Sequence, residues 1–307
     1  MFLVIFLYML IASTFTIGKL ALQYVQPIFF ISVRMLVGGS LLLGFLYFFR
    51  RSDLKIYKKN VWDFGAIVLF HIFFAFVAEF WALQYLSSSK VCLFYNLSPF
   101  ISAVFSYFWF AEHMTKRKLF GLFLGFCGFI PVIVASGVSD SSSNAFWFFS
   151  WPELAMLISV VSACYGWIVV RKLGRQGYSM LAINGIGMLG GGLLAFFTSL
   201  VIEGMPAFRV ISHSAMRDFF ACAGYAALLI LLANVVFYNL YGYLLRRYTA
   251  TFLSFAGFLT PVFAALYGWL LLGESVGWSF FLTIILVFCG LFIFYQEELR
   301  QGYIVRR

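Results

Sequence analysis

The sequence predicts an all-α membrane protein with ten transmembrane helices, arranged as two inverted five-helix repeats. Three observations predict this: the composition, the series of long apolar segments, and a similarity between the two halves of the chain. Of the 307 residues, 64% are hydrophobic and 10% are charged, whereas soluble domains are roughly half apolar and about a quarter charged. A chain this apolar cannot cover itself with polar surface in water, so the composition excludes an ordinary soluble protein.

The apolar segments have the length that a bilayer requires. A helix that crosses the hydrocarbon core needs about 20 mostly apolar residues. Ten such segments are expected at 2–21, 27–49, 62–86, 91–111, 119–137, 152–170, 179–202, 219–244, 249–272 and 277–295. Their connections are short, and no soluble domain is inserted. The expected units are a first repeat at 1–137, an outer linker at 138–151, a second repeat at 152–295 and a cytoplasmic tail at 296–307.

The Lys and Arg residues indicate the orientation, because cytoplasmic connections carry an excess of them. With the N-terminus inside, the outer connections hold three of the 21 basic residues, Lys90, Arg209 and Arg217. The inner connections hold 16, at Arg50, Arg51, Lys55, Lys58, Lys59, Lys116, Arg117, Lys118, Arg171, Lys172, Arg175, Arg246, Arg247, Arg300, Arg306 and Arg307. Both termini are therefore expected in the cytoplasm, in a multi-pass protein of a cell inner (plasma) membrane. This topology explains the net charge of +10 without nucleic acid as a partner.

The two halves share a spaced pattern of residues. Pro99 precedes Glu112 by 13 residues, and Pro261 precedes Glu274 by the same distance. A unit with an odd number of helices enters the membrane from the opposite side when it is repeated. Inverted repeats are typical of alternating-access transporters, whose substrate site lies near the midplane between the repeats.

These stretches resemble the EamA type of the drug/metabolite transporter superfamily, and the resemblance covers nearly the whole chain. The segments that carry it are Ala82–Tyr85 through Leu97-Ser98-Pro99 to Ala111-Glu112, Leu259-Thr260-Pro261 to Gly273-Glu274-Ser275, Ser13-Thr14-Phe15 leading to Lys19, and Ser32-Val33-Arg34. The resemblance implies ten helices, a central cavity, and export or exchange of small metabolites. One departure is Ala111, which stands where the family usually has Gly before the glutamate.

Ionisable side chains inside apolar segments indicate functional sites in membrane proteins. Here they are Lys19, Arg34, His71 and Glu79. Arg34 and Glu79 each lie seven residues from the outer end of their segments, so at about 1.5 Å per residue both are about 10 Å below the outer boundary. An Arg34–Glu79 ion pair with Lys19 nearby is expected. It would serve either as a binding or coupling site, in which Glu79 can take up a proton, or as a structural pair that fixes helix packing.

Two further pairs of residues match between the repeats. His71 and Asn234 lie 163 residues apart near the middle of their segments. Because unpaired polar groups are costly in hydrocarbon, these two should line a cavity or hydrogen-bond between helices. Pro99 and Pro261 are predicted in mid-helix, where each removes a backbone hydrogen bond. They are expected to act as paired hinges or to form static kinks.

Other polar and aromatic side chains are candidates for the cavity wall, where rings can stack on a substrate or hold a cation. Those selected as substrate-binding, beside the residues above, are Trp81, Tyr95, Asn96, Tyr165, Trp167 and Tyr238. With 41 Phe and 21% aromatic residues overall, most rings must face lipid or pack between helices instead.

The motifs favour secondary transport over catalysis. The sequence has no phosphate-binding loop before a helix, no metal cluster and no pair of nucleophile and base, so no cofactor and no enzymatic activity are expected. The predicted function is transport of a small polar or amphipathic metabolite by exchange or ion coupling, with a proton or a counter-substrate. The resemblance to the EamA type implies two kinds of candidate substrate: amino acids, and S-adenosylmethionine exchanged for S-adenosylhomocysteine. The alternative is a lipid-linked flippase or a non-transporting membrane scaffold.

Overall fold

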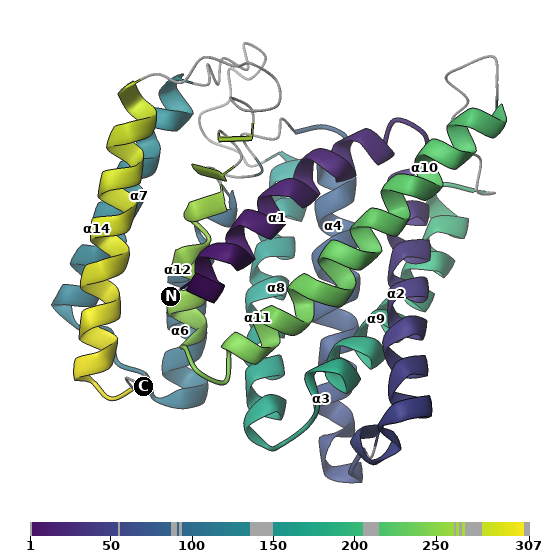
Figure 1. The fold of residues 1–307 in the computed structure, drawn as a ribbon, viewed down its shortest axis with the longest axis horizontal. Coiled ribbons are helices and arrows are strands. Elements are labelled where there is room, and N and C mark those ends of the chain that lie inside the picture. Colours follow the sequence, from purple (N-terminus) through teal and green to yellow (C-terminus); the bar gives the residue numbers. More distant parts are fainter. Residues whose placement is uncertain are drawn as a thin grey trace.

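The computed structural model describes residues 2–54, 56–86, 91, 94–135, 150–204, 215–260, 262–263, 266–267 and 278–303. Within these ranges every regular element is helical. The helices form one bundle in which α1 and α10 cross the others obliquely (Figure 1). The first half contains α1 (Phe2–Ala21), α2 (Pro27–Phe49), η1 (Arg51–Leu54), η2 (Lys58–Asn60), α3 (Val61–Ala66), η3 (Ile67–Phe74), α4 (Ala75–Ala82), α6 (Ser98–Phe110) and α7 (Lys116–Ala135). The second half contains α8 (Trp151–Arg175), α9 (Met180–Ile202), α10 (Ala215–Leu229), η4 (Ile230–Phe237), α11 (Tyr238–Leu244), α12 (Ala250–Ala256) and α14 (Trp278–Arg300).

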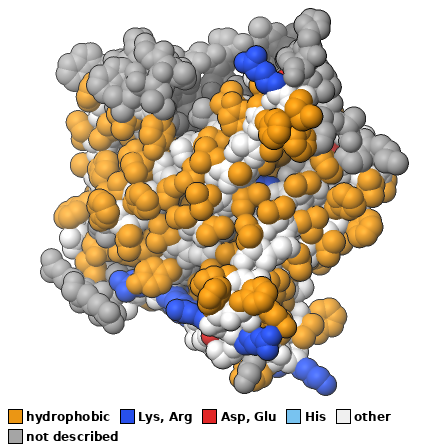
Figure 2. Space-filling model, turned by 45° about the vertical axis from the view of Figure 1, so that its right-hand side comes forward, with side chains coloured by type: hydrophobic (Ala, Val, Ile, Leu, Met, Phe, Trp, Pro, Cys, Tyr) orange, Lys and Arg blue, Asp and Glu red, His pale blue; other side chains and the backbone are white. Residues whose placement is uncertain are grey.

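Six described helical segments are long and apolar enough to cross a membrane: Pro27–Phe49, Lys58–Ala82, Trp151–Arg175, Met180–Ile202, Met216–Leu244 and Phe281–Arg300. A shorter apolar helix covers Phe2–Thr14. The expected spans at 91–111, 119–137 and 249–272 include residues outside the described ranges, so the number ten stays a prediction. On the face shown in Figure 2, hydrophobic side chains form a broad band, and most of the visible Lys and Arg lie at its lower end. This arrangement is the one expected of a multi-pass membrane protein.

Glycines allow α2 and α9 to pack closely against each other. A Cβ added to Gly39 of α2 would lie 2.7 Å from the backbone nitrogen of Leu189 in α9. A Cβ on Gly192 would lie 3.0 Å from the nitrogen of Leu36. Only glycine allows two helix backbones to approach this closely, as small-residue interfaces do in membranes. Elsewhere in the bundle α6 packs on α12, α7 on α14, α1 on α10, and α8 on η3 and α4.

Two long helices contain a π-helical segment, which the hydropathy pattern does not predict. Both η3 and η4 have eight residues. His71 and Asn234 occupy the fifth position of their respective segments. A π-helical turn is wider than an α-helical one and is frequent at functional sites. Each π segment therefore places one polar side chain on the inner side of its helix.

Two helices continue past the apolar segments that predict them. The segment predicted at 152–170 extends to Arg175, and the one predicted at 277–295 extends to Arg300. The charged ends of these helices are stabilised by ion pairs with other helices: Lys172 Nζ lies 2.8 Å from Asp63 Oδ1, and Lys118 Nζ lies 3.0 Å from Glu298 Oε1. Hydropathy alone does not reveal such tertiary partners, so the predicted ends were too early.

The mid-helix position predicted for Pro99 is wrong. A turn at 96–97 interrupts the predicted span, and α6 begins at Ser98 with the proline in its first turn. Proline is well accommodated there because the first helical N–H groups have no partner within the helix. Ser98 Oγ donates to the carbonyl oxygen of Tyr95 at 2.6 Å. The chain is therefore broken, rather than kinked, beside Tyr95.

Ala111 ends α6 in the left-handed conformation, with φ 51°. This is the position at which the sequence resemblance expects Gly. A left-handed conformation costs a residue with a Cβ roughly 1 kcal/mol. We expect Ala111→Gly to raise the free energy of unfolding by about that amount. Ala163→Gly, inside the regular helix α8, should lower the free energy of unfolding by a similar amount. Thermal unfolding of the two purified variants tests this, and a loss of stability in both would contradict it.

Candidate functional site

A buried cluster of charged and hydroxyl groups lies between α2, α4 and the turn before α6. Arg34 is 5% exposed and Glu79 is 6% exposed. Tyr95 Oη donates to Glu79 Oε2 at 2.7 Å, while the guanidinium carbon of Arg34 lies 5.3 Å from the centre of the Phe76 ring. Arg34 and Glu79 attract each other electrostatically, but the described residues form no direct Arg34–Glu79 salt bridge. The acid and the base are thus close and buried without neutralising each other directly.

Aromatic rings form the adjoining wall. The imidazole of His71 lies 4.3 Å from the Trp167 ring, edge to face, and 5.3 Å from the Tyr238 ring. Trp167 also stacks on Tyr241, with ring centres 3.9 Å apart and an interplanar angle of 26°. Phe76, which lies under Arg34, contacts Tyr238 at 6.3 Å. Phe76 therefore joins the charged cluster to the aromatic wall. Arg34, Glu79, His71 and Tyr238 are buried, whereas Phe76 and Trp167 are partly exposed.

His71 and Asn234 have polar atoms that nothing in the described part of the chain satisfies. Both ring nitrogens of His71 are buried without a hydrogen-bond partner, and so is Asn234 Oδ1. Asn234 Nδ2 lies 3.1 Å from Met35 Sδ and 3.5 Å from Met188 Sδ, and thioethers are weak acceptors. An unpaired buried polar atom destabilises the fold. A ligand or an ordered water molecule bound beside these atoms would satisfy them.

Other candidates lie away from this cluster. Tyr165 is on the opposite side of α8 from Trp167 and contacts Phe70 at 5.2 Å and Trp109 at 5.6 Å. A difference of two residues turns a helical side chain by about 200°, which accounts for the separation. Asn96 is buried in the turn before α6, and its Nδ2 has no partner in the described chain.

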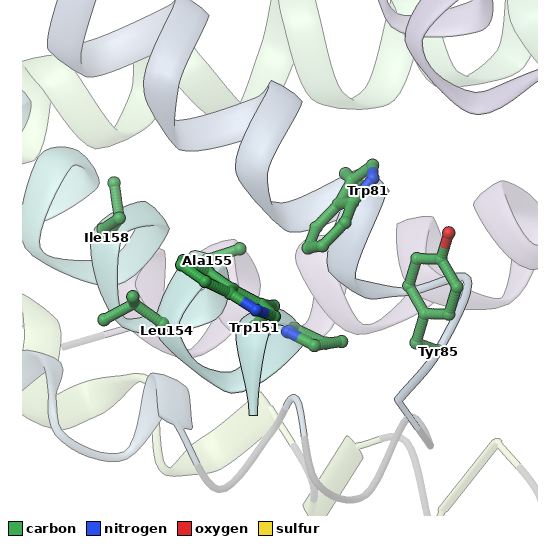
Figure 3. Close-up of a pocket in the computed structure, with 7 residues that line it drawn as sticks. Trp81, Tyr85, Trp151, Leu154, Ala155 and Ile158 are labelled. Carbon is green, nitrogen blue, oxygen red and sulfur yellow. The ribbon is translucent and has the colours of Figure 1, made fainter. Parts of the chain in front are cut away.

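Trp81 lines an apolar groove of about 590 Å³ at the surface. The groove lies between the end of α4 and the start of α8 (Figure 3). Its other lining residues are Tyr85, Trp151, Pro152, Leu154, Ala155 and Ile158. Two remaining candidates are outside the described residues: the side chain of Lys19, whose backbone belongs to α1, and Pro261.

Comparison with known proteins places the chain in a family. Residues 1–134 and 150–296 each match the model of the EamA-like transporter family. The chain belongs to the EamA-like transporter family. It is 33% identical to an S-adenosylmethionine/S-adenosylhomocysteine transporter of Chlamydia muridarum, over 96% of this chain and 91% of the relative. The protein of the same name from Chlamydia trachomatis serovar L2 is also 33% identical, over 96% of this chain and 88% of the relative. One crystal structure covers 98% of this chain with a TM-score of 0.71 and 16% identity, which shows a shared fold.

In this EamA-like transporter the candidate site also includes two rings that the sequence does not single out. Phe76 and Phe80 lie 5.3 and 6.0 Å from the guanidinium carbon of Arg34. Helical spacing could have indicated Phe76, because it is three residues before Glu79. Tyr241, one of the further aromatic candidates in the sequence, stacks on Trp167. Among so many aromatic residues, only the packing of the helices distinguishes these from the lipid-facing rings.

The transporter also has a buried ion pair at the basic end of the bundle. Arg171 Nη2 of α8 lies 2.7 Å from Glu112 Oε1, which follows α6, and the two side chains are 1% and 7% exposed. The guanidinium carbon of Arg171 also lies 4.5 Å from the centre of the Phe110 ring. Arg171 Nε and Nη1 and Glu112 Oε2 have no hydrogen-bond partner within the described chain. This pair links α8 to the end of α6.

Proposed function

We propose that this transporter exchanges S-adenosylmethionine for S-adenosylhomocysteine across a cell inner membrane by alternating access. The proposal rests on one largely buried cluster, in which a carboxylate and a guanidinium are joined through Phe76 to a stack of aromatic rings. The identity to the chlamydial relatives, over nearly the full length of both chains, supports the same substrate pair.

The three groups of the site match three parts of the proposed substrate. S-adenosylmethionine has a sulfonium cation, an amino acid end with a carboxylate, and an adenine ring. Glu79 can attract the sulfonium, and Arg34 can bind the carboxylate through charge-assisted hydrogen bonds. Trp167, with Tyr241 behind it, can stack on adenine. A plain amino acid would use Arg34 and Glu79 but would leave the aromatic wall without a partner.

The arrangement of the helices supports alternating access through inverted repeats. The pairs α2 and α9, α6 and α12, and α7 and α14 join helices that hold the same place in the two halves. The segments η3 and η4 also hold equivalent places, 163 residues apart. Ten helices with both termini in the cytoplasm would place the basic, Arg171-bearing end of the bundle inside. The Arg171–Glu112 pair would then break when the inner side opens.

Stacking on the aromatic wall is tested by Trp167→Ala. Stacking of a base on an aromatic side chain contributes about 1–3 kcal/mol, so we expect a roughly 10- to 100-fold higher half-saturating concentration of S-adenosylmethionine. The matched control is Tyr165→Ala, two residues away on the opposite side of α8. This variant should change the half-saturating concentration less than about threefold. Uptake by proteoliposomes preloaded with S-adenosylhomocysteine gives the measurement.

The substrate class itself is tested in the same proteoliposomes. Labelled S-adenosylmethionine should enter saturably only when a counter-substrate is inside, and labelled amino acids should enter at least about tenfold more slowly. If an amino acid is exchanged and the adenosyl compounds are not, the adenosyl assignment is wrong. If Tyr165→Ala and Trp167→Ala reduce uptake equally, the aromatic wall is not the binding surface.

A further inference from the structure

A second polar cavity lies at the basic end of the molecule, outside the transport site. Its volume is about 570 Å³. It lies among the end of α2, the turn η1, the α8–α9 connection, the start of α9 and the end of α11. Its lining residues are Arg50, Ser52, Asp53, Tyr57, Gln176, Gly177, Tyr178, Ser179, Met180, Leu181, Asn239, Tyr243 and Arg246. None of the transport-site residues contributes to it.

The charges of this cavity favour an anion. Arg50 and Arg246 supply two guanidinium groups, and Asp53 is the one acid among the lining residues. Asp53 Oδ1 is engaged by Ser52 Oγ at 3.3 Å. Arg246 Nη2 donates to the carbonyl oxygen of Tyr178 at 2.6 Å, which fixes the guanidinium at the cavity wall. Guanidinium groups bind phosphate with parallel hydrogen bonds, so two of them beside polar side chains suit a phosphate group.

The start of α9 adds to this positive potential. Ser179, Met180 and Leu181 belong to the cavity wall, and Ser179 makes no side-chain cap hydrogen bond. The first N–H groups of a helix have no partner within the helix, and the helix dipole is positive at this end. In a 23-residue helix, these N–H groups reinforce the two arginines that line the same cavity.

The surroundings point to a lipid as the source of the phosphate. The last turn of α2, next to Arg50, has Phe48 and Phe49 exposed at 78% and 75%. Arg51 and Arg247, which follow two of the cavity residues, rest on the rings of Tyr47 and Tyr243 at 4.1 and 4.8 Å. Exposed aromatic rings beside arginines are typical of the membrane boundary, and basic cavities between helices at that level bind anionic headgroups.

We propose that this cavity binds the phosphate of an anionic phospholipid from the adjacent leaflet, held by Arg50 and Arg246. The acyl chains would lie against the exposed rings of the last turn of α2. The site is separate from the transport site and does not depend on which metabolite is carried.

The experiment is native mass spectrometry of the full-length protein in detergent, titrated with phosphatidylglycerol or phosphatidylcholine. Wild-type protein should retain phosphatidylglycerol in preference to phosphatidylcholine. Each arginine should contribute about fivefold to the affinity for the lipid. The double variant Arg50→Gln with Arg246→Gln should therefore retain phosphatidylglycerol roughly 25-fold more weakly. The matched control, Arg51→Gln with Arg247→Gln, removes the same charge one residue further along each segment and should retain the lipid. Arg50→Gln alone, at the exposed end of α2, gives a variant that leaves the Arg246–Tyr178 bond intact.

Three outcomes would overturn the proposal. Equal losses of lipid retention in the two double variants would show that lipid is attracted to the basic surface in general. Unchanged lipid retention in Arg50→Gln and in Arg50→Gln with Arg246→Gln would show that the cavity does not bind the lipid. Calorimetry with inorganic phosphate separates the two sources of a phosphate group: we expect no saturable binding at or below about 1 mM, which corresponds to a binding free energy of about −4 kcal/mol. Saturable binding of inorganic phosphate without lipid binding would assign the cavity to a soluble anion instead.

Discussion

Replacing Glu79 by Gln should reduce uptake of S-adenosylmethionine about 10- to 100-fold. This is the effect expected when one charge-assisted contact with the substrate is lost. Gln has nearly the same size and can still accept the hydrogen bond from Tyr95 Oη. It cannot balance a sulfonium cation or the buried Arg34. The measurement is initial uptake by proteoliposomes loaded with S-adenosylhomocysteine.

The control for this variant is Glu153→Gln, in the first turn of α8, where the carboxylate accepts from the Ser150 backbone nitrogen at 2.7 Å. It removes the same charge away from the cluster and should leave uptake within about twofold of wild type. Unchanged uptake in Glu79→Gln, with wild-type protein active, would show that Arg34 and Glu79 only fix the packing of α2 on α4. Parallel loss in both variants would point to a general effect of charge.

The second large effect should come from the buried ion pair at the basic end. Glu112→Ala leaves the Arg171 guanidinium buried without its anion, and breaking a buried pair in this way costs about 3–5 kcal/mol. We expect the double variant Glu112→Leu with Arg171→Met to recover most of this loss, because an apolar pair of similar volume needs no desolvation. The midpoint of thermal unfolding in detergent measures both.

Asp63 and Lys172 provide the comparison, since α8 also carries this pair and its contact distance is similar, 2.8 Å against 2.7 Å. Its side chains are 19% and 38% exposed, so water screens the charges. Asp63→Ala should therefore lower the stability by less than about 1 kcal/mol. If Glu112→Ala and Asp63→Ala have equal effects, burial does not govern the contribution of the Arg171–Glu112 pair.

Several features of the site could be predicted from the sequence because membranes restrict polar groups so strongly. Arg34, His71 and Glu79 stand out in apolar segments, and the structure buries all three. The contacts among them could not be predicted. The sequence pointed to a direct Arg34–Glu79 pair, whereas the carboxylate accepts from Tyr95 and the guanidinium rests on Phe76.

Hydropathy and segment length were sufficient to predict the helical membrane class and the bounds of α1 and α2, which match the predicted 2–21 and 27–49. They were sufficient because the hydrocarbon core fixes both the length and the composition of a spanning helix. The packing of the helices against one another sets which aromatic rings face inward, as Trp167 and Tyr165 illustrate, and where η3 and η4 widen their helices. The same packing brings Arg50 and Arg246 to one cavity. Hydropathy records what a helix is made of, whereas the direction in which each side chain points depends on the helices packed around it.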